Sequence, residues 1–264
     1  MLVTEYADFQ RFMVAFAITA VRVVAAMELL PALSSSMVTG LGRRAAALAF
    51  ALLAVPVTLK TMPSVNELST LYLGVVALKE TAIGLLIGFF AAVPFWIAEN
   101  VGNVIDNQRG ATMGEVYSPL SGAQVSTTGI FFTQIVSTIF FVGGAILIFL
   151  GAIYKSWAIF PIFSGDLAVA SSAATTMLST VDMVMRTTFI IAAPIIILMF
   201  LATIGLGFVN RTAPQLNVFF LSMPIKSALG IAMLIIYLQY IMDMLMYTND
   251  KPILDSLRRV FTGG

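Results

Sequence analysis

The chain contains six long apolar runs, and several of them exceed the roughly 18 apolar residues that cross a bilayer. These runs span residues 12–33, 45–62, 70–98, 129–153, 187–209 and 217–246. In lipid, only helices and closed barrels satisfy every backbone polar group, and runs this long and continuous do not suit barrel strands. The sequence therefore predicts an all-α, polytopic integral membrane protein of packed helical hairpins. We expect about six apolar helices, with possible additional short or re-entrant helices.

Composition supports this class and argues against others. Hydrophobic residues make up 59% of the 264 residues and charged residues 10%, whereas soluble proteins carry about 25% charged residues. The net charge of +1 argues against a nucleic-acid surface. Because the chain has no cysteine and no histidine, it lacks disulfides, thiolate metal sites and the commonest general base. We predict no catalytic residue, no metal and no cofactor.

Two weaker segments accompany the six runs. Residues 167–181, rich in Ala, Ser and Thr, are expected to form a seventh, half-length or amphipathic helix. The tail, residues 251–264, places apolar residues at helical spacing opposite charged ones and predicts a short amphipathic helix. That helix would lie either at the membrane interface or against a partner. The first run is interpreted as a retained segment and not a removed signal peptide. All segments are assigned to a single membrane-embedded domain, residues 1–264.

Ionisable and proline residues interrupt most of the runs, including Arg22, Glu28, Pro56, Lys79, Glu80, Pro94, Pro194, Pro224 and Lys226. An ionisable group at membrane depth costs roughly 2.5–3.5 kcal/mol, so such groups usually face protein or water. The adjacent Lys79 and Glu80 cannot share a helix face. Each is expected to pair elsewhere in an assembly, although Lys79 could instead snorkel to the interface and Glu80 could serve a proton relay.

A polar island separates the third run from the fourth, with the sequence ENVGNVIDNQRGATMGEVYSPLSGAQVSTTG over residues 99–129. The i, i+4, i+7 spacing of Glu99, Asn103 and Asp106 predicts one polar helix face, opposite the apolar residues between Ile97 and Ile105. The helix should end near Gly110. A polar face there implies water or a polar partner, unless the helix is an ordinary amphipathic extension from the bilayer.

Residues 108–122 are punctuated by glycine and proline, which permit tight turns and close backbone approach. The apolar residues Met113, Val116, Tyr117 and Leu120 give this stretch surface to bury. A packed loop is therefore favoured over a mobile linker, and connectors of this length tend to be functional or disordered.

A second polar cluster, NRTAPQLNVFFLSMPIKSA, covers residues 210–228. Arg211 could neutralise a carboxylate or bind a helix C-terminus. Pro214 is expected to begin a new helix, with Gln215 and Asn217 forming hydrogen bonds at the turn. A well-satisfied hairpin turn is the equally weighted alternative.

The stretches PFWIAENVGNVIDNQRGAT, RTAPQLNVFFLSMPIKS and KETAIGLLIGF resemble the T subunit of the type III secretion export apparatus, the SctT/YscT/SpaR family, which is related to the flagellar export-gate protein FliR. The resemblance covers nearly the full chain. It implies a non-enzymatic pore and gate subunit in the bacterial inner membrane, with helical hairpins held partly above the bilayer plane. The implied partners are the R and S subunits and the U-type switch protein, with unfolded secreted proteins as cargo.

The resemblance also implies that the loop at 108–122 helps to close the pore. The implied plug residues are Gln108, Arg109, Gly110, Met113, Gly114, Val116, Tyr117 and Leu120. The expected assembly contacts are Lys79, Glu80, Arg211, Pro214, Gln215, Asn217 and Lys226.

Two other function classes remain open from the residues alone. A secondary transporter or channel could use Glu80, Asp106 and Arg211 for a small solute or ion, although the inverted repeats common in transporters are not evident. An intramembrane enzyme would have to rely on aspartate. Energy for export would have to come from elsewhere, since the chain has no GxxxxGK[ST] phosphate-binding loop.

Overall fold

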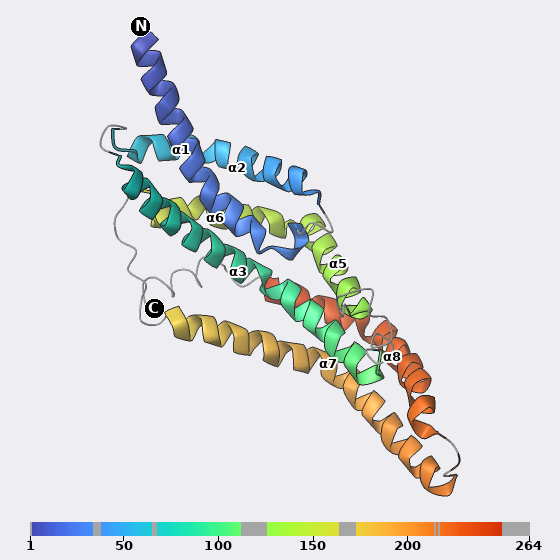
Figure 1. Cartoon of the computed structure of the whole chain (residues 1–264). Helices are drawn as coiled ribbons and strands as arrows, with labels where there is room; N and C mark the ends of the chain where they lie inside the picture. Colours follow the sequence, from blue (N-terminus) through green and yellow to red (C-terminus); the bar gives the residue numbers. More distant parts are fainter. Residues whose placement is uncertain are drawn as a thin grey trace. The chain divides into compact units, whose positions relative to one another are not determined.

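The computed structural model describes residues 2–33, 38–64, 68–111, 126–163, 173–213, 215 and 217–249. Within these ranges the chain forms seven α-helices and the short 3-10 helix η1 (Pro31–Leu33), and the all-α prediction is confirmed (Figure 1). The helices are α1 (Leu2–Glu28), α2 (Gly40–Thr61), α3 (Thr70–Arg109), α5 (Thr127–Val142), α6 (Ala145–Ile159), α7 (Ala173–Thr212) and α8 (Val218–Asn249). The predicted tail helix, residues 251–264, lies outside the described residues.

Among the described residues, five helices are long and apolar enough to cross a membrane, or six if α5 and α6 count as one bent span. The predicted run 129–153 contains two helices, because α5 and α6 are bent by 70° at their break. Gly143 and Gly144 occupy the break, and Gly144 has a φ of 78°. Glycine enters this left-handed region without the steric cost that a Cβ would impose.

Two helices are much longer than the predicted runs. Helices α3 and α7 each contain 40 residues, which corresponds to about 60 Å at 1.5 Å per residue. That length is about twice the hydrocarbon thickness of a bilayer. The part of the weak run 167–181 from Ala173 onward belongs to α7 and is not a separate short helix. The earlier part of that run lies outside the described residues.

The described residues form two compact units, whose boundaries cut α3 between Val93 and Pro94 and α7 between Ser179 and Thr180. The first unit holds α1, η1, α2, the first part of α3, the end of α5, α6 and the start of α7. The second holds the remainder of α3, most of α5, the remainder of α7 and α8.

In the first unit, α1 packs against both α2 and α3. The hydroxyl groups of Thr19 and Thr58 share a buried hydrogen bond of 2.7 Å between α1 and α2. A Cβ added at Gly84 of α3 would meet the backbone of Arg22, and one at Gly88 would meet that of Ala26. Small residues permit this close backbone approach between helices.

In the second unit, α7 turns one stripe of side chains inward. The buried stripe consists of Val184, Thr188, Ile191, Ala192, Ile195 and Met199. Gly230 of α8 leaves room for the Met199 thioether, whose sulfur would lie 3.3 Å from a Cβ there. The other faces of α7 carry large exposed apolar side chains, including Phe189, Phe200 and Phe208. Such faces suit lipid or partner helices and not water.

Candidate functional site

The two ends of the polar island are held together by Asp106, near the end of α3. Asp106 is only 2% exposed. Its carboxylate accepts hydrogen bonds from Ser126 Oγ at 2.7 Å, Thr128 N at 3.0 Å and Thr128 Oγ1 at 2.6 Å. Arg109 Nη2 lies 2.9 Å from the Asp106 Oδ1 atom. Asp106 therefore places a negative charge at the start of α5, where free N–H groups and the helix dipole favour it.

Helices α3 and α5 also approach each other directly at glycines. A Cβ added at Gly102 would collide with the backbone N and Cα of Gly129. A Cβ added at Gly129 would lie 3.0 Å from the Glu99 carbonyl oxygen and 3.1 Å from Asn103 Oδ1. The chain therefore leaves α3 and enters α5 at one point, and the stretch between them begins and ends there.

The end of α3 is closed by a glycine, as the sequence predicts. Gly110 has a φ of 80°. Its N–H donates to the Asn107 carbonyl, and the Ala111 N–H donates to the Asp106 carbonyl, each at 3.1 Å. This pattern is a Schellman motif. Of the predicted plug residues, Gln108, Arg109 and Gly110 are described. Met113, Gly114, Val116, Tyr117 and Leu120 lie outside the described residues.

The two predicted faces at the end of α3 differ in burial. Ile97, Val101 and Ile105 are buried. On the polar side, Glu99 is exposed, Asn103 is half-buried and Asp106 is buried. The polar partner of Asp106 is thus a neighbouring helix of the same chain, and sequence reasoning missed Ser126 and Thr128. The available signal was the run of Ser and Thr residues at the start of α5, which could bind the aspartate near the end of α3.

A second polar cluster lies in the first unit, where it joins α1, α3 and α6. Arg22 and Glu80 each have 0% exposure. The guanidinium Nε and Nη2 donate to the two Glu80 carboxylate oxygens at 2.7 and 2.8 Å. Arg22 Nη1 donates to Ser156 Oγ at 2.8 Å, and the guanidinium carbon lies 5.5 Å from the centre of the Trp157 ring. This is a two-pronged, desolvated ion pair with additional hydrogen bonds.

The sequence predicted that Lys79 and Glu80 pair elsewhere in an assembly, yet both have partners within the chain. Lys79 Nζ donates to the carbonyls of Pro161 and Ile162. Arg22 and Glu80 are both charges in apolar helices, and such a charge must find a partner at membrane depth. This was the available signal for their pairing.

The remaining predicted contact residues lie around the α7–α8 connection. Arg211 is exposed in the last turn of α7, and Gln215 is exposed in the turn. Asn217 Oδ1 accepts a hydrogen bond of 3.5 Å from Phe220 N and so caps α8, which begins at Val218 and not at Pro214. Lys226 is half-buried on α8. Pro214 itself lies outside the described residues.

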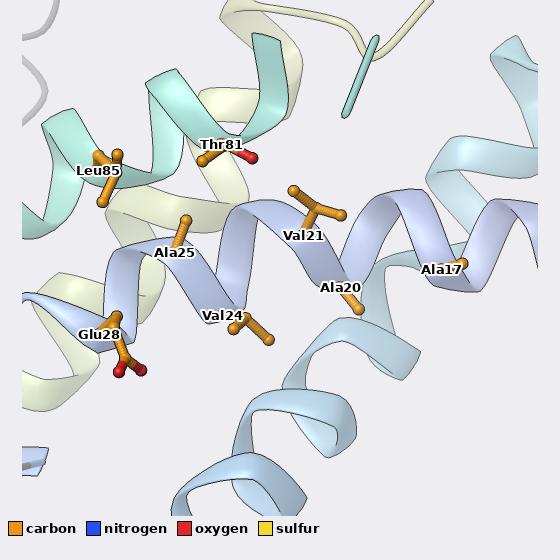
Figure 2. A pocket seen from close by; sticks show the side chains of 8 residues that line it. All are labelled: Ala17, Ala20, Val21, Val24, Ala25, Glu28, Thr81 and Leu85. Carbon is orange, nitrogen blue, oxygen red and sulfur yellow. The ribbon is translucent and has the colours of Figure 1, made fainter. Parts of the chain in front are cut away.

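A groove of about 460 Å³ runs along α1 and α3 in the first unit. It is lined by Ala17, Ala20, Val21, Val24, Ala25, Glu28, Thr81 and Leu85; α3 supplies only the last two (Figure 2). Its one ionisable residue, Glu28, lies 3.0 Å from Arg43 Nη2. The groove offers small apolar side chains and no acid–base pair. In the described part of the chain no group of three or more Asp or Glu side chains could hold a metal ion.

Replacing Asp106 by alanine should destabilise the second unit. Ser126 and Thr128 would lose their acceptor and Arg109 its partner, and hydrogen bonds to a charged group contribute about 1.5–3 kcal/mol each. We expect a lower thermal-unfolding midpoint for purified protein carrying D106A. The matched control is D182A, which removes an exposed carboxylate from α7. Equal midpoints for the two variants would show that the Asp106 contacts contribute nothing.

Comparison with known proteins finds that the sequence is similar to bacterial export proteins. The family described as "Bacterial export proteins, family 1" matches residues 13–251. The chain is 37% identical over 234 residues to the Yop proteins translocation protein T of Yersinia pestis, covering 89% of each chain. It is 34% identical over 247 residues to the secretion system apparatus protein SsaT of Salmonella typhimurium, covering 91% of this chain and 93% of the relative. It is 32% identical over 169 residues to the flagellar biosynthetic protein FliR of Bacillus subtilis, covering 62% of this chain and 64% of the relative.

Proposed function

We infer a function in protein export for this chain, which belongs to the bacterial export proteins, family 1. It is a non-enzymatic, multi-pass membrane component of a type III secretion or flagellar export apparatus in the bacterial inner membrane. As an apparatus component it works in complex with other subunits.

We propose that the chain is a pore and gate subunit, and that the loop at 108–122 helps to close the pore. The observation that carries this proposal is the single anchor point at Asp106, Gly102 and Gly129. An anchor that fixes both ends of a polar stretch lets that stretch project from packed helices while its base stays rigid. A Gly-punctuated segment with apolar residues, mounted in this way, suits the closing of a narrow passage.

The proposed partners are the R and S subunits, the U-type switch protein and, as cargo, unfolded secreted proteins. The exposed apolar faces of α7 and α8 support a position among other membrane helices. The length of α7 adds to this argument, because its exposed apolar residues run from Leu178 to Val209. That stretch is longer than the roughly 30 Å hydrocarbon core, so lipid alone does not cover it.

The plug proposal is tested by replacing residues 112–122 with a short glycine–serine linker while keeping Asp106, Arg109 and Ser126. In the assembled apparatus this variant should make the inner membrane leak ions or small solutes, measured as dye entry into cells. The linker variant should still purify with its partner subunits. Normal assembly together with unchanged permeability would exclude a closing role for the loop.

The alternative, a secondary transporter or channel for a small solute, has less support. Two of its three candidate groups, Glu80 and Asp106, are held by hydrogen bonds within the chain, and Arg211 is exposed. Reconstituted protein that carries a solute without partner subunits would favour this alternative over export.

A further inference from the structure

The backbone directly after α6 is not helical, and four consecutive carbonyl oxygens there are bound by side chains. Phe160 O accepts from Arg22 Nη2 at 2.9 Å. Pro161 O and Ile162 O both accept from Lys79 Nζ, at 2.8 and 2.6 Å. Phe163 O accepts from the Tyr72 hydroxyl at 3.2 Å. All three donors come from α1 and α3.

The sequence explains why the helix stops here. The last backbone bond of α6 runs from Phe160 N to Ser156 O at 2.8 Å. Pro161 disfavours helical geometry in the residue before it and has no N–H to continue the ladder. The hydrogen-bond ladder of α6 therefore ends at Ser156, and the carbonyls of Phe160–Phe163 lie beyond it.

These carbonyls lie in partly buried surroundings with apolar neighbours. Ile162 is 2% exposed. Phe163 packs against a buried cluster formed by Ala15, Val55 and Met62. An unsatisfied carbonyl in such surroundings costs several kcal/mol in a membrane, so the side-chain donors supply what water would otherwise provide.

The donors belong to segments that qualify as membrane spans. Arg22 lies within the span Asp8–Glu28, and Tyr72 and Lys79 lie within the span Thr70–Arg109. Non-helical backbone at membrane depth is tolerated only where protein or a water-filled cavity surrounds it. The charges are also complementary, because the C-terminus of a helix carries a partial negative charge that a cation stabilises.

We propose that Phe160–Phe163 is a fixed break in a membrane-crossing part of the chain, in which Arg22, Lys79 and Tyr72 replace water at four carbonyl oxygens. Glu80 balances the Arg22 charge. Lys79 is the tethered cation of the site, since one ammonium group binds two successive carbonyls. In this arrangement Lys79 and Tyr72 are positioning residues: they hold the backbone of Pro161, Ile162 and Phe163 in place.

The chain has no natural cysteine, so a single introduced cysteine reports directly on this break. In the assembled complex, in native membranes, I162C is treated with a water-soluble maleimide, and S64C, at an exposed non-helical residue after α2, serves as the reference. We expect I162C to react at least about tenfold more slowly than S64C. The substitution K79M should then raise the I162C rate about tenfold or more, because hydrogen bonds to a charged donor are lost.

Two matched variants separate this proposal from a general loss of charge or packing. K60M removes an exposed lysine from the last turn of α2 and should leave the I162C rate unchanged. K79R keeps the cation and should preserve most of the protection. If K79M prevents assembly, the maleimide reaction rate of F163C is compared with and without Y72F. We expect Y72F to raise that rate, by less than K79M raises the rate of I162C.

The proposal is overturned if I162C reacts as fast as S64C, since the break would then lie in water. It is equally overturned if K79M, or Y72F with F163C, leaves the rate unchanged. If K79R loses the protection as fully as K79M does, a cation at position 79 is not what protects the break. None of these readings depends on protein export, so they stand apart from the plug experiment.

Discussion

Replacing Glu80 by alanine is expected to abolish the assembly of this chain into a stable complex. The substitution leaves the Arg22 guanidinium fully buried with no counter-charge, and removing one partner of a buried pair costs about 3–5 kcal/mol. That is a large part of the 5–15 kcal/mol by which a protein domain is typically stable. The measurement is the yield of complex recovered in mild detergent with tagged partner subunits.

The control for this prediction is E28A, which breaks the ion pair with Arg43. The Glu28 side chain is 57% exposed, and exposed pairs contribute about 0–1 kcal/mol. We expect near-normal yield from E28A. A double variant, R22M with E80M, should recover part of the yield lost in E80A, because buried pairs are often replaceable by apolar residues of similar volume. Equal yields from E80A and E28A would show that the buried pair is dispensable.

The helices themselves were predictable because their apolar runs are long, and the end of α3 followed from glycine and from helical spacing. The break between α5 and α6 was overlooked, although two successive glycines, Gly143 and Gly144, lie inside the run. A hydropathy pattern averages over such a site, whereas backbone geometry depends on the single residue that tolerates a positive φ.

The polar contacts were harder to predict, because they join residues far apart in the sequence. Arg22 and Glu80 stand out individually as charges in apolar helices, but pairing them requires knowing that α1 and α3 cross at Gly84 and Gly88. For Asp106 the sequence predicted a polar helix face. Its burial could not be inferred, since the face could have turned to water as readily as to α5.

Helices α3 and α5 also cross closely, at Gly102 and Gly129. A substitution at Gly102 should therefore have a large effect on assembly. Replacing Gly102 by alanine should push α3 and α5 apart, because the new methyl group would meet the Gly129 backbone. No side-chain rotation relieves such a clash, and overpacking typically costs about 1–3 kcal/mol or more. The shift would also pull Asp106 away from Ser126 and Thr128. We therefore expect a reduced yield of complex, with the remaining complex leaking in the dye-entry assay.

Gly74, also in α3, provides the matched control, because a Cβ added there meets no atom within 4 Å. Alanine is favoured over glycine within a helix by about 1 kcal/mol, so G74A should assemble as well as the native chain and stay sealed. Both substitutions raise the helix propensity of α3. A difference between G74A and G102A therefore reports on the α3–α5 crossing alone. If G102A assembles normally and stays sealed, the α3–α5 contact does not set the base of the loop. If G102A assembles poorly but the recovered complex stays sealed, the crossing supports the fold without controlling the pore.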